Sequence, residues 1–424
     1  FTDNVQDGRP QVYKDKGYRV HASNLCLTGD QRVVTDRGYL TAKELHEQGG
    51  SLTLFDGRKP VQASRMKLRE RDADAFKVTF ANGMEQKLTA YHGVPVWKGS
   101  SAKGWDRVPV SDLEVGDRVW TQTEKGLFGD RSMEDEAFLL GLYQSDGSQT
   151  GNGTITLDIW EQDFDLEQEI EERFERVHNK YGCDTYEISN GQGPTGHFRD
   201  NPAPNFRECK VVTGNRVRKR RLASKTLSKA LDFQKGFVPQ WIWESDEATQ
   251  WSYVRGLLLA DGWVHRSNGS RGTPIQIGYG EVNLDFLKEL QLLFNNLGLQ
   301  SSIRDLHEAG QQRLPDGKGG TKLYNCQKSY RLVLGSKNNA LEIERNTGFL
   351  SRKGVELEDR HYNDNTKKAY AVTSIEHIGK EDVYCPTVET DEHVFTSQGM
   401  LTFNCSEICL PSNEEESFVC CLSS

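Results

Sequence analysis

The sequence contains no long hydrophobic run: no stretch approaches the roughly 18 apolar residues needed to span a bilayer. The N-terminus is polar and charged, without the pattern of a secretory signal. Positive charge is in deficit, with a net charge of −9 and a pI of about 5.7, so the chain as a whole lacks the basic character of a non-specific nucleic-acid binder. We expect a globular, cytoplasmic protein without membrane contact, and any DNA contact must come from a local basic patch.

Cysteine is scarce and scattered, with nine residues and no histidines at a zinc-finger spacing. Two cysteines stand out by position. Cys26 follows Leu25, and Cys405 directly follows Asn404. A segment that begins with a thiol and ends with Asn before a second thiol can excise itself by acyl transfer. The first thiol attacks the preceding carbonyl, the second accepts the acyl group, and the Asn amide attacks its own carbonyl.

The pattern of elements changes twice along the chain. Short β-like runs separated by Asp-Gly and Asn-Gly turns fill residues 26–129, and they resume in residues 356–404. The segment between them, 130–355, mixes helical and strand patterns. We therefore predict an all-β domain interrupted by an α+β domain. Residues 1–25 and 405–424 are too few for a core of their own and resemble the flanks of a larger host protein.

The middle segment contains an internal repeat. The run from Gly141 to Asp146 corresponds to the run from Gly256 to Asp261, at an offset of 115 residues, and a Gly follows each Asp. In both runs small residues lie four positions apart, on one face of a helix, which allows two helices to pack closely. The order of the matches predicts two similar halves with pseudo-twofold symmetry.

Close packing of these helices would bring Asp146 and Asp261 together at one end. Two carboxylates repel each other unless a divalent cation lies between them. Paired carboxylates that hold Mg²⁺ are typical of phosphodiester hydrolysis. The alternative is that Asp-Gly merely ends each helix, and the two copies at matched spacing argue against it.

A second candidate pair lies after an expected strand, where Thr89 and His92 are three positions apart. A histidine can protonate a leaving amine, and a hydroxyl can support a polarised carbonyl. The alternative is a turn with an exposed histidine, which the spacing alone favours.

One stretch is basic in this acidic chain. Between Arg207 and Lys229 there are nine basic residues against a single acid, Glu208. Phosphate neutralisation drives sequence-independent DNA affinity, so this stretch is the candidate DNA-binding surface, and a solvated loop is the alternative. Its central part contains Arg216, Arg218, Lys219, Arg220 and Arg221.

The ends of the 26–404 segment resemble the sequence blocks of inteins. The matching stretches are Cys26-Leu27-Thr28-Gly29-Asp30, Leu88-Thr89-Ala90-Tyr91-His92, Val383-Tyr384-Cys385-Pro386-Thr387 and Gly399-Met400-Leu401-Thr402-Phe403-Asn404, with His393 before the last. The resemblance implies a horseshoe-like all-β Hint fold that splices without a cofactor. It assigns the following roles: Cys26 as first nucleophile, Cys405 as accepting nucleophile, Asn404 as cyclising residue, Thr89 and His92 as activators of the upstream bond, and His393 as a helper of Asn cyclisation.

Two positions depart from the intein pattern. Phe403 stands where the family usually has a histidine before the terminal Asn, which shifts activation of the downstream bond to His393. Cys385 stands where the family often has Asp. Its thiol could transfer a proton if its pKa were depressed, or it could be a buried packing residue.

The two repeated runs resemble the motifs of LAGLIDADG homing endonucleases, the second more closely than the first. The resemblance implies that Asp146 and Asp261 are metal-binding catalytic acids, that Lys235 supports catalysis, and that Mg²⁺ is required. The expected partner is a double-stranded DNA target, the host gene without the insert, and we expect a monomer.

The flanks resemble the active-site segment of the ribonucleotide reductase large subunit. Joined directly, they read Asn24-Leu25-Cys405-Ser406-Glu407. The resemblance implies that Cys405 carries the thiyl radical and that Asn24 and Glu407 contact substrate, although this fragment alone cannot reduce nucleotides. Two alternatives remain open: a Hint domain that cleaves without ligation, and a DNA-binding insertion with an inactive nuclease.

Overall fold

The computed structural model describes most of the chain in two units. The described residues are 5–6, 9–10, 19–20, 26–97, 104–149, 155–160, 165–182, 207–211, 217–224, 234–266, 275–315, 320–355, 367–390, 392–404 and 411–412. The first unit, here called the β unit, comprises Phe1–Gly129 and Thr366–Ser424. The second, here called the α+β unit, comprises Asp130–Asn365. Among the described segments, no helix has the length and hydrophobicity of a membrane span.

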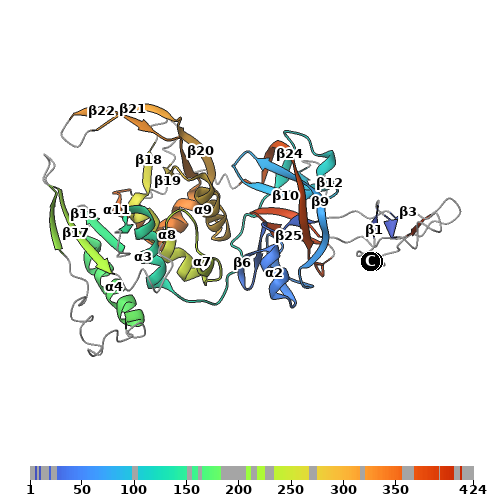
Figure 1. The fold of residues 1–424 in the computed structure, drawn as a ribbon, viewed down its shortest axis with the longest axis horizontal. Helices are drawn as coiled ribbons and strands as arrows, with labels where there is room; N and C mark the ends of the chain where they lie inside the picture. Colours follow the sequence, from blue (N-terminus) through green and yellow to red (C-terminus); the bar gives the residue numbers. More distant parts are fainter. Residues whose placement is uncertain are drawn as a thin grey trace. The chain divides into compact units, whose positions relative to one another are not determined.

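The larger sheet of the β unit joins strands from both ends of the sequence. Within the described residues it has seven strands in the order β12-β11-β13-β24-β4-β10-β9. The two long strands β9 and β24 also pair along their length (Figure 1). The strands are β4 (Leu27–Thr28), β9 (Lys67–Phe80), β10 (Glu85–Thr89), β11 (Gly93–Trp97), β12 (Trp105–Pro109), β13 (Arg118–Trp120) and β24 (Ala369–Cys385).

A smaller sheet packs into the same core. Its described strands follow the order β26-β25-β5-β7-β8, and β6 pairs with β5. They are β5 (Arg32–Thr35), β6 (Gly38–Thr41), β7 (Leu52–Phe55), β8 (Pro60–Ala63), β25 (Val394–Ser397) and β26 (Met400–Phe403). Helix α2 (Ala42–Gln48) begins with a capping box between Thr41 and Glu44, and η1 (Val110–Asp112) is a short 3₁₀ turn.

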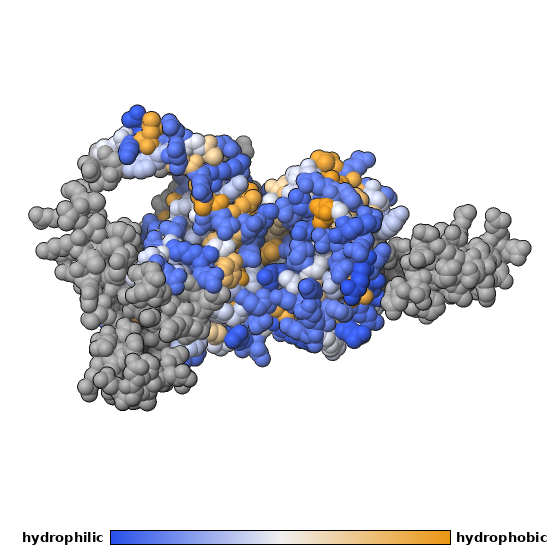
Figure 2. Space-filling view, in the orientation of Figure 1, coloured by the Kyte–Doolittle hydropathy of each residue, from blue (hydrophilic) through white to orange (hydrophobic). Residues whose placement is uncertain are grey.

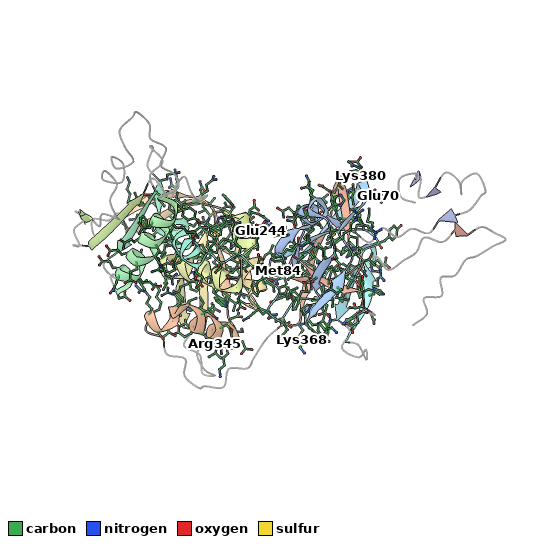
Figure 3. All side chains as sticks on the ribbon, turned by 90° about the horizontal axis from the view of Figure 1, so that it is seen from below. Glu70, Met84, Glu244, Arg345, Lys368 and Lys380 are labelled. Atoms are coloured by element: carbon green, nitrogen blue, oxygen red, sulfur yellow. The ribbon has the colours of Figure 1, made fainter. Side chains whose placement is uncertain are left out.

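The long β9–β24 ribbon carries charged side chains, several of them exposed along its middle. Glu70 and Lys380 lie close together at this part of the ribbon in Figure 3. Partial burial raises the pKa of the Glu70 carboxyl, and the charge of Lys380 opposes that shift. On the face shown in Figure 2, the described surface is mostly hydrophilic with small apolar patches, as expected for a charged chain.

The α+β unit repeats one arrangement. Its two described four-stranded sheets have the orders β14-β15-β17-β16 and β18-β19-β23-β20, which match strand for strand. The first half contains α3 (Glu134–Asp146), β14 (Ser148–Gln149), β15 (Ile155–Trp160), α4 (Glu167–Gly182), β16 (Arg207–Val211) and β17 (Val217–Ser224). The second half contains α8 (Glu247–Asp261), β18 (Trp263–Arg266), β19 (Ile275–Glu281), α9 (Leu284–Asn296), β20 (Ser302–His307), β23 (Ser329–Leu334), α10 (Lys337–Thr347) and α11 (Phe349–Arg352).

The remaining described elements are short or lie outside the repeat. Helix α7 (Gln240–Trp243) precedes α8, and the hairpin of β21 (Gly310–Pro315) and β22 (Thr321–Cys326) is an insertion in the second half. Two short pairs lie near the chain ends: β1 (Val5–Gln6) with β2 (Arg9–Pro10), and β3 (Arg19–Val20) with β27 (Pro411–Ser412).

Together the two units confirm the predicted fold class. An all-β domain is interrupted by an α+β domain with pseudo-twofold symmetry. The strand of the β unit that follows the interruption, β24, pairs with β13, β9 and β4, which precede it. The interruption therefore leaves one continuous β core.

Helices α3 and α8 pack against each other at the symmetry axis. A Cβ atom at Gly141 would lie 2.4 Å from the carbonyl oxygen of Tyr253, and one at Gly256 would lie 2.3 Å from that of Phe138. Only glycine permits such an approach, so the small-residue spacing in the sequence sets the distance between the helices. Both helices are buried over most of their length, which explains why apolar residues occupy nearly all of their faces.

Candidate functional site

The first candidate site is centred on Cys26 in the β unit. The backbone N–H of Cys26 donates to Thr89 Oγ1 at 3.2 Å, and the N–H of Thr89 donates to the carbonyl oxygen of Cys26 at 3.1 Å. The nitrogen of Cys26 belongs to the peptide bond that a splicing reaction must break. Thr89 at the end of β10 therefore contacts that bond directly.

His92 connects this centre to strand β26 of the β unit. Its backbone N–H donates to the carbonyl oxygen of Thr89 at 3.0 Å, and its side-chain Nε2 contacts the hydroxyl of Thr402 on β26. The side chain of His92 is fully buried, so the alternative of an exposed turn histidine is wrong. Thr402 is two residues from Asn404, and this chain of contacts links the two ends of the 26–404 segment.

Cys385 packs beside Cys26. In the antiparallel pairing of β24 with β4, Tyr384 lies opposite Leu27, so the register places Cys385 opposite Cys26. Both are buried thiols, and together with Ala73 and Val383 they form one small cluster. This position is compatible with both roles considered for Cys385, proton transfer and packing, because its thiol is buried and also lies beside Cys26.

Asn404 and His393 lie together at the open end of the β25–β26 hairpin. The N–H of Asn404 donates to the carbonyl oxygen of His393 at 2.9 Å. The side-chain amide of Asn404 is oriented so that both its nitrogen and its oxygen form hydrogen bonds. Nδ2 donates to His393 O at 3.1 Å, and the side-chain oxygen accepts from the N–H of Val388 at 2.5 Å. The buried amide is therefore held by backbone atoms at both its oxygen and its nitrogen.

The hairpin geometry follows from local sequence. Gln398 and Gly399 have φ angles of 52° and 72°, the pattern of a two-residue type I′ turn, which fixes the pairing of Ser397 with Met400. His393 also has a positive φ, 53°, which is costly for a non-glycine residue. Its Nδ1 contacts the carbonyl oxygen of Val388 at 3.2 Å.

Three of the site residues predicted from the sequence lie outside the described residues: Cys405, Asn24 and Glu407. Sequence reasoning missed Thr402 as the partner of His92. The signal was available, because strand residues two apart share a face and Thr402 is two positions before Asn404.

The second candidate site lies where α3 and α8 end in the α+β unit. Asp146 and Asp261 are the last residues of these helices. Lys235 Nζ donates to the carbonyl oxygen of Ser145 at 3.1 Å. Although this ammonium reaches solvent, surrounding protein desolvates it and lowers its pKa, while the charges of Asp261 and Asp146 oppose that shift.

Asp261 is affected by the same neighbours. Its carboxylate is solvent-accessible, but partial desolvation raises its pKa, and the negative charge of Glu281 raises it further, while Lys235 and Lys353 oppose the shift. Tyr279 OH lies 3.1 Å from Ser145 Oγ, and its burial raises the pKa of the phenol. Glu281 and Tyr279 on β19 are neighbours of the site that sequence reasoning missed, because no motif marks them.

The loop that carries Lys235 is fixed by Gln144. Gln144 Nε2 donates to the carbonyl oxygens of Gln234 at 2.9 Å and Phe237 at 2.8 Å, on either side of Lys235. Its side-chain oxygen accepts from the hydroxyl of Tyr253 on α8. Gln144, which makes the first repeated run differ from the second, therefore has a structural function.

The described parts of the basic stretch, 207–211 and 217–224, are strands of a sheet. Arg218, Lys219, Arg220 and Arg221 belong to β17, the strand between β15 and β16, with Arg221 paired to Asp158 and to Arg207. Arg216 lies outside the described residues. One inner strand of this sheet is thus rich in basic residues.

The second half of the α+β unit is similar to a known domain family. Residues 248–348, which contain α8 and most of the second half, match the family model of the LAGLIDADG-like domain. A variant of the homing endonuclease I-DmoI, solved with nicked target DNA and manganese, is 17% identical over 50% of this chain and 94% of its own, with a TM-score of 0.29.

Two further similarities cover most of the chain, one to a ribonucleotide reductase subunit and one to a solved mini-intein. The ribonucleoside-diphosphate reductase NrdEB subunit alpha of Bacillus subtilis (strain 168) is 26% identical over 96% of this chain and 38% of its own length. The chain thus spans well under half of that relative. A mutant of the Ssp DnaB mini-intein is 7% identical over 89% of this chain and 98% of its own, with a TM-score of 0.27. The resemblance inferred from the sequence, to an intein with an embedded LAGLIDADG endonuclease in a ribonucleotide reductase, is confirmed.

Proposed function

We propose that the β unit splices the chain, excising residues 26–404 and joining the flanks. Cys26 Sγ attacks the carbonyl carbon of Leu25, the peptide bond breaks and a thioester forms as the Cys26 nitrogen becomes an amine. Cys405 Sγ then takes over the acyl group. Asn404 Nδ2 attacks its own backbone carbonyl carbon, which releases the Cys405 amine, and this amine attacks the thioester to form the new peptide bond.

The observation that carries this proposal is the pair of hydrogen bonds between Cys26 and Thr89. A hydroxyl on the scissile nitrogen can support the proton that this nitrogen must gain as it leaves. His92 contacts Thr89 through its backbone N–H and Thr402 through its imidazole, which supports its proposed role as an activator of the upstream bond. The contacts of the Asn404 side-chain amide with the backbone of His393 and Val388 fix the orientation of the group that must attack the backbone carbonyl of the same residue.

A single gel tests the splicing proposal. The expressed full chain should yield an excised protein and a short ligated product. Cys26→Ala should abolish the thioester and with it ligation, whereas Asn404→Ala should block release of the downstream flank. Separate flanks from the unmutated chain would favour cleavage without ligation, and an unchanged full-length band would favour the inactive DNA-binding insertion.

For the α+β unit we propose site-specific double-strand DNA hydrolysis that depends on Mg²⁺. Asp146 and Asp261 supply hard oxygen donors at the symmetry axis. Within the described residues, no group of three or more His, Cys, Asp or Glu side chains is placed to hold a metal. This donor set fits Mg²⁺, which commonly takes one or two carboxylates and completes its shell with water and substrate phosphate. The bound ion would lower the pKa of the attacking water and neutralise charge on the phosphate.

The chain's own residues would orient the DNA. Lys235, held beside both carboxylates, contributes positive charge where the scissile phosphate must lie. The basic strand β17 offers cationic residues from a sheet, a geometry by which some proteins enter a DNA groove. The solved relative bound to its target DNA is consistent with this partner.

The nuclease proposal is tested with a linear DNA fragment that encodes the two flanks joined without the insert. In the presence of MgCl₂ the purified protein should cut both strands near the junction, and EDTA should prevent cleavage. Asp146→Asn and Asp261→Asn should each abolish cutting. Asp305→Asn is the matched control, because this exposed acid of the same unit pairs with Lys328 away from the helix ends. Intact DNA in every lane would contradict the proposal.

The host is the third part of the proposal. Joined flanks would restore the Asn24-Leu25-Cys405 run, in which Cys405 would carry the radical and Asn24 and Glu407 would contact substrate. Because most of the relative's length lies outside this chain, nucleotide reduction requires the larger host.

A further inference from the structure

The residue before Asn404 has unusual surroundings. The ring of Phe403 is nearly buried and packs edge-on against Trp105, with ring centroids 5.1 Å apart. The guanidinium carbon of Arg107 lies 5.1 Å from the centroid of the same ring. Trp105 and Arg107 are two residues apart on β12 and so share one face of the sheet. A cation thus lies over the ring of Phe403, one residue before Asn404, whose bond to Cys405 is the downstream scissile bond.

The neighbouring strand is shaped to admit this arginine. A Cβ atom at Gly93 would lie 2.5 Å from Arg107 Nε and 2.8 Å from its Cγ. Any side chain at position 93 would displace the arginine, so the glycine next to His92 leaves the path across β11 open. The arginine therefore crosses β11 at Gly93, the residue after His92, and its guanidinium lies over Phe403, the residue before Asn404.

During cyclisation of Asn404, negative charge develops that a nearby cation can stabilise. As Nδ2 attacks the backbone carbonyl carbon, negative charge develops on the carbonyl oxygen, and the bond to the Cys405 nitrogen then breaks. The proton that Nδ2 loses is balanced by the one that the leaving amine gains. An arginine stays protonated, so it cannot supply that proton, but it can stabilise the oxygen's charge.

We propose that Arg107 takes over the electrostatic part of the function that a histidine at position 403 would perform, by stabilising the charge on the Asn404 carbonyl oxygen during cyclisation. Phe403 positions the guanidinium by stacking beneath it. This inference rests on the proposed splicing function, and it explains how the downstream junction can be broken with Phe403 in place of histidine.

Two backgrounds separate the junctions. In Cys26→Ala, only Asn cyclisation can cleave the chain, so the downstream cleavage rate reports on that step alone. In Asn404→Ala, cleavage at the upstream junction by an added thiol reports on the fold and on thioester formation. Each background is combined with Arg107→Ala, Arg107→Lys, and Arg107→Ala with Phe403→His.

Arg107→Ala should slow downstream cleavage by about tenfold or more, the scale of losing one charge-stabilising group at a solvent-accessible site, and leave upstream cleavage unchanged. Arg107→Lys should retain part of the rate because the charge remains. Phe403→His should restore cleavage in the Arg107→Ala chain. The control is Arg118→Ala, since Arg118 makes a similar contact with Trp97, 4.7 Å from the ring centroid, and both cleavages should persist.

Unchanged downstream cleavage in Arg107→Ala would overturn the inference, and so would equal loss at both junctions, which would indicate a structural role. If neither junction is cleaved in the parent backgrounds, the splicing function itself is refuted, and the inference falls with it.

Discussion

At the scale of single residues, Thr89 is the point where sequence and chemistry meet most directly. It ends β10 and is nearly buried, and its hydroxyl lies on the nitrogen of Cys26. A buried N–H that lost this acceptor would be costly, and the nitrogen of the scissile bond would lose its hydrogen bond to the Thr89 hydroxyl. The hydroxyl therefore contributes both to the fold and to the proposed reaction.

We predict that Thr89→Ala slows upstream cleavage by about tenfold or more, at the low end for a group that assists proton transfer. Thr89→Ser keeps the hydroxyl and should remain close to the parent. The measurement is the rate of thiol-induced cleavage in the Asn404→Ala background. Equal rates for the Ala and Ser variants would remove the hydroxyl from the mechanism.

The site residues could be predicted from the sequence where a motif marks them. The contacts between residues that are distant in the sequence could not. The motifs single out Cys26 and Asn404 at the segment ends. The contact of His92 with Thr402 joins residues that are 310 positions apart, and the stacking of Arg107 on Phe403 depends on how β11, β12 and β26 meet. Such contacts arise from tertiary packing, which single-sequence patterns do not encode.

At the scale of elements, helix α3 holds the loop before α7 in place. Gln144 on α3 binds carbonyl oxygens on both sides of Lys235, while the corresponding position on α8 is Leu259. The two halves of the unit therefore differ in the surroundings of Lys235 and its counterpart Lys353. Lys235 is held against Ser145, whereas the ammonium of Lys353 lies over the ring of Phe349 at 5.6 Å.

We predict that Gln144→Leu lowers DNA cleavage by about tenfold or more, because small displacements of a positioning group are costly in catalysis. DNA binding should change little, whereas the thermal unfolding temperature should fall, because the buried hydroxyl of Tyr253 loses its acceptor. Cleavage rates and binding to the same DNA fragment measure the two effects. Undiminished cleavage would show that the loop keeps its position without Gln144.

Helices α3, α4 and α8 are also joined by ion pairs. Asp135 on α3 contacts Arg173 and Arg176 on α4, and Glu169 on α4 contacts Arg255 on α8. Burial raises the pKa of the Asp135 carboxyl, but the hydrogen bond from Arg176 and the charge of Arg173 outweigh it and hold the pKa below its ordinary value of 3.8. A lowered pKa means that the ionised form stabilises the folded state.

We predict that Asp135→Asn lowers the free energy of unfolding of the α+β unit by about 1 kcal/mol at pH 7. The difference from the parent should persist down to about pH 4, since the unfolded carboxyl is still ionised above that value. It should disappear as the pH falls below 3.8 through the lower folded-state pKa. Urea unfolding across this range measures it, and a difference that grew in acid would contradict the assignment.

At the scale of the whole molecule, the sequence predicted one domain inserted in another, and the structure has that architecture. The prediction succeeded because the β-like runs on either side of the insertion and the repeat offset inside it are regular patterns. The pairing of β24 with strands on both sides of it, and the extra β21–β22 hairpin, could not be predicted, because strand order is decided by packing.

The central claim is that the two edges of residues 26–404 react with each other, and intact-mass spectrometry of the purified products tests it most directly. We predict two species: an excised protein that begins at Cys26 and ends in a succinimide at Asn404, one water lighter than a free C-terminal Asn, and a ligated peptide in which Leu25 is joined to Cys405. A spectrum that holds only the full-length mass, or only the masses of separate flanks, would contradict the account.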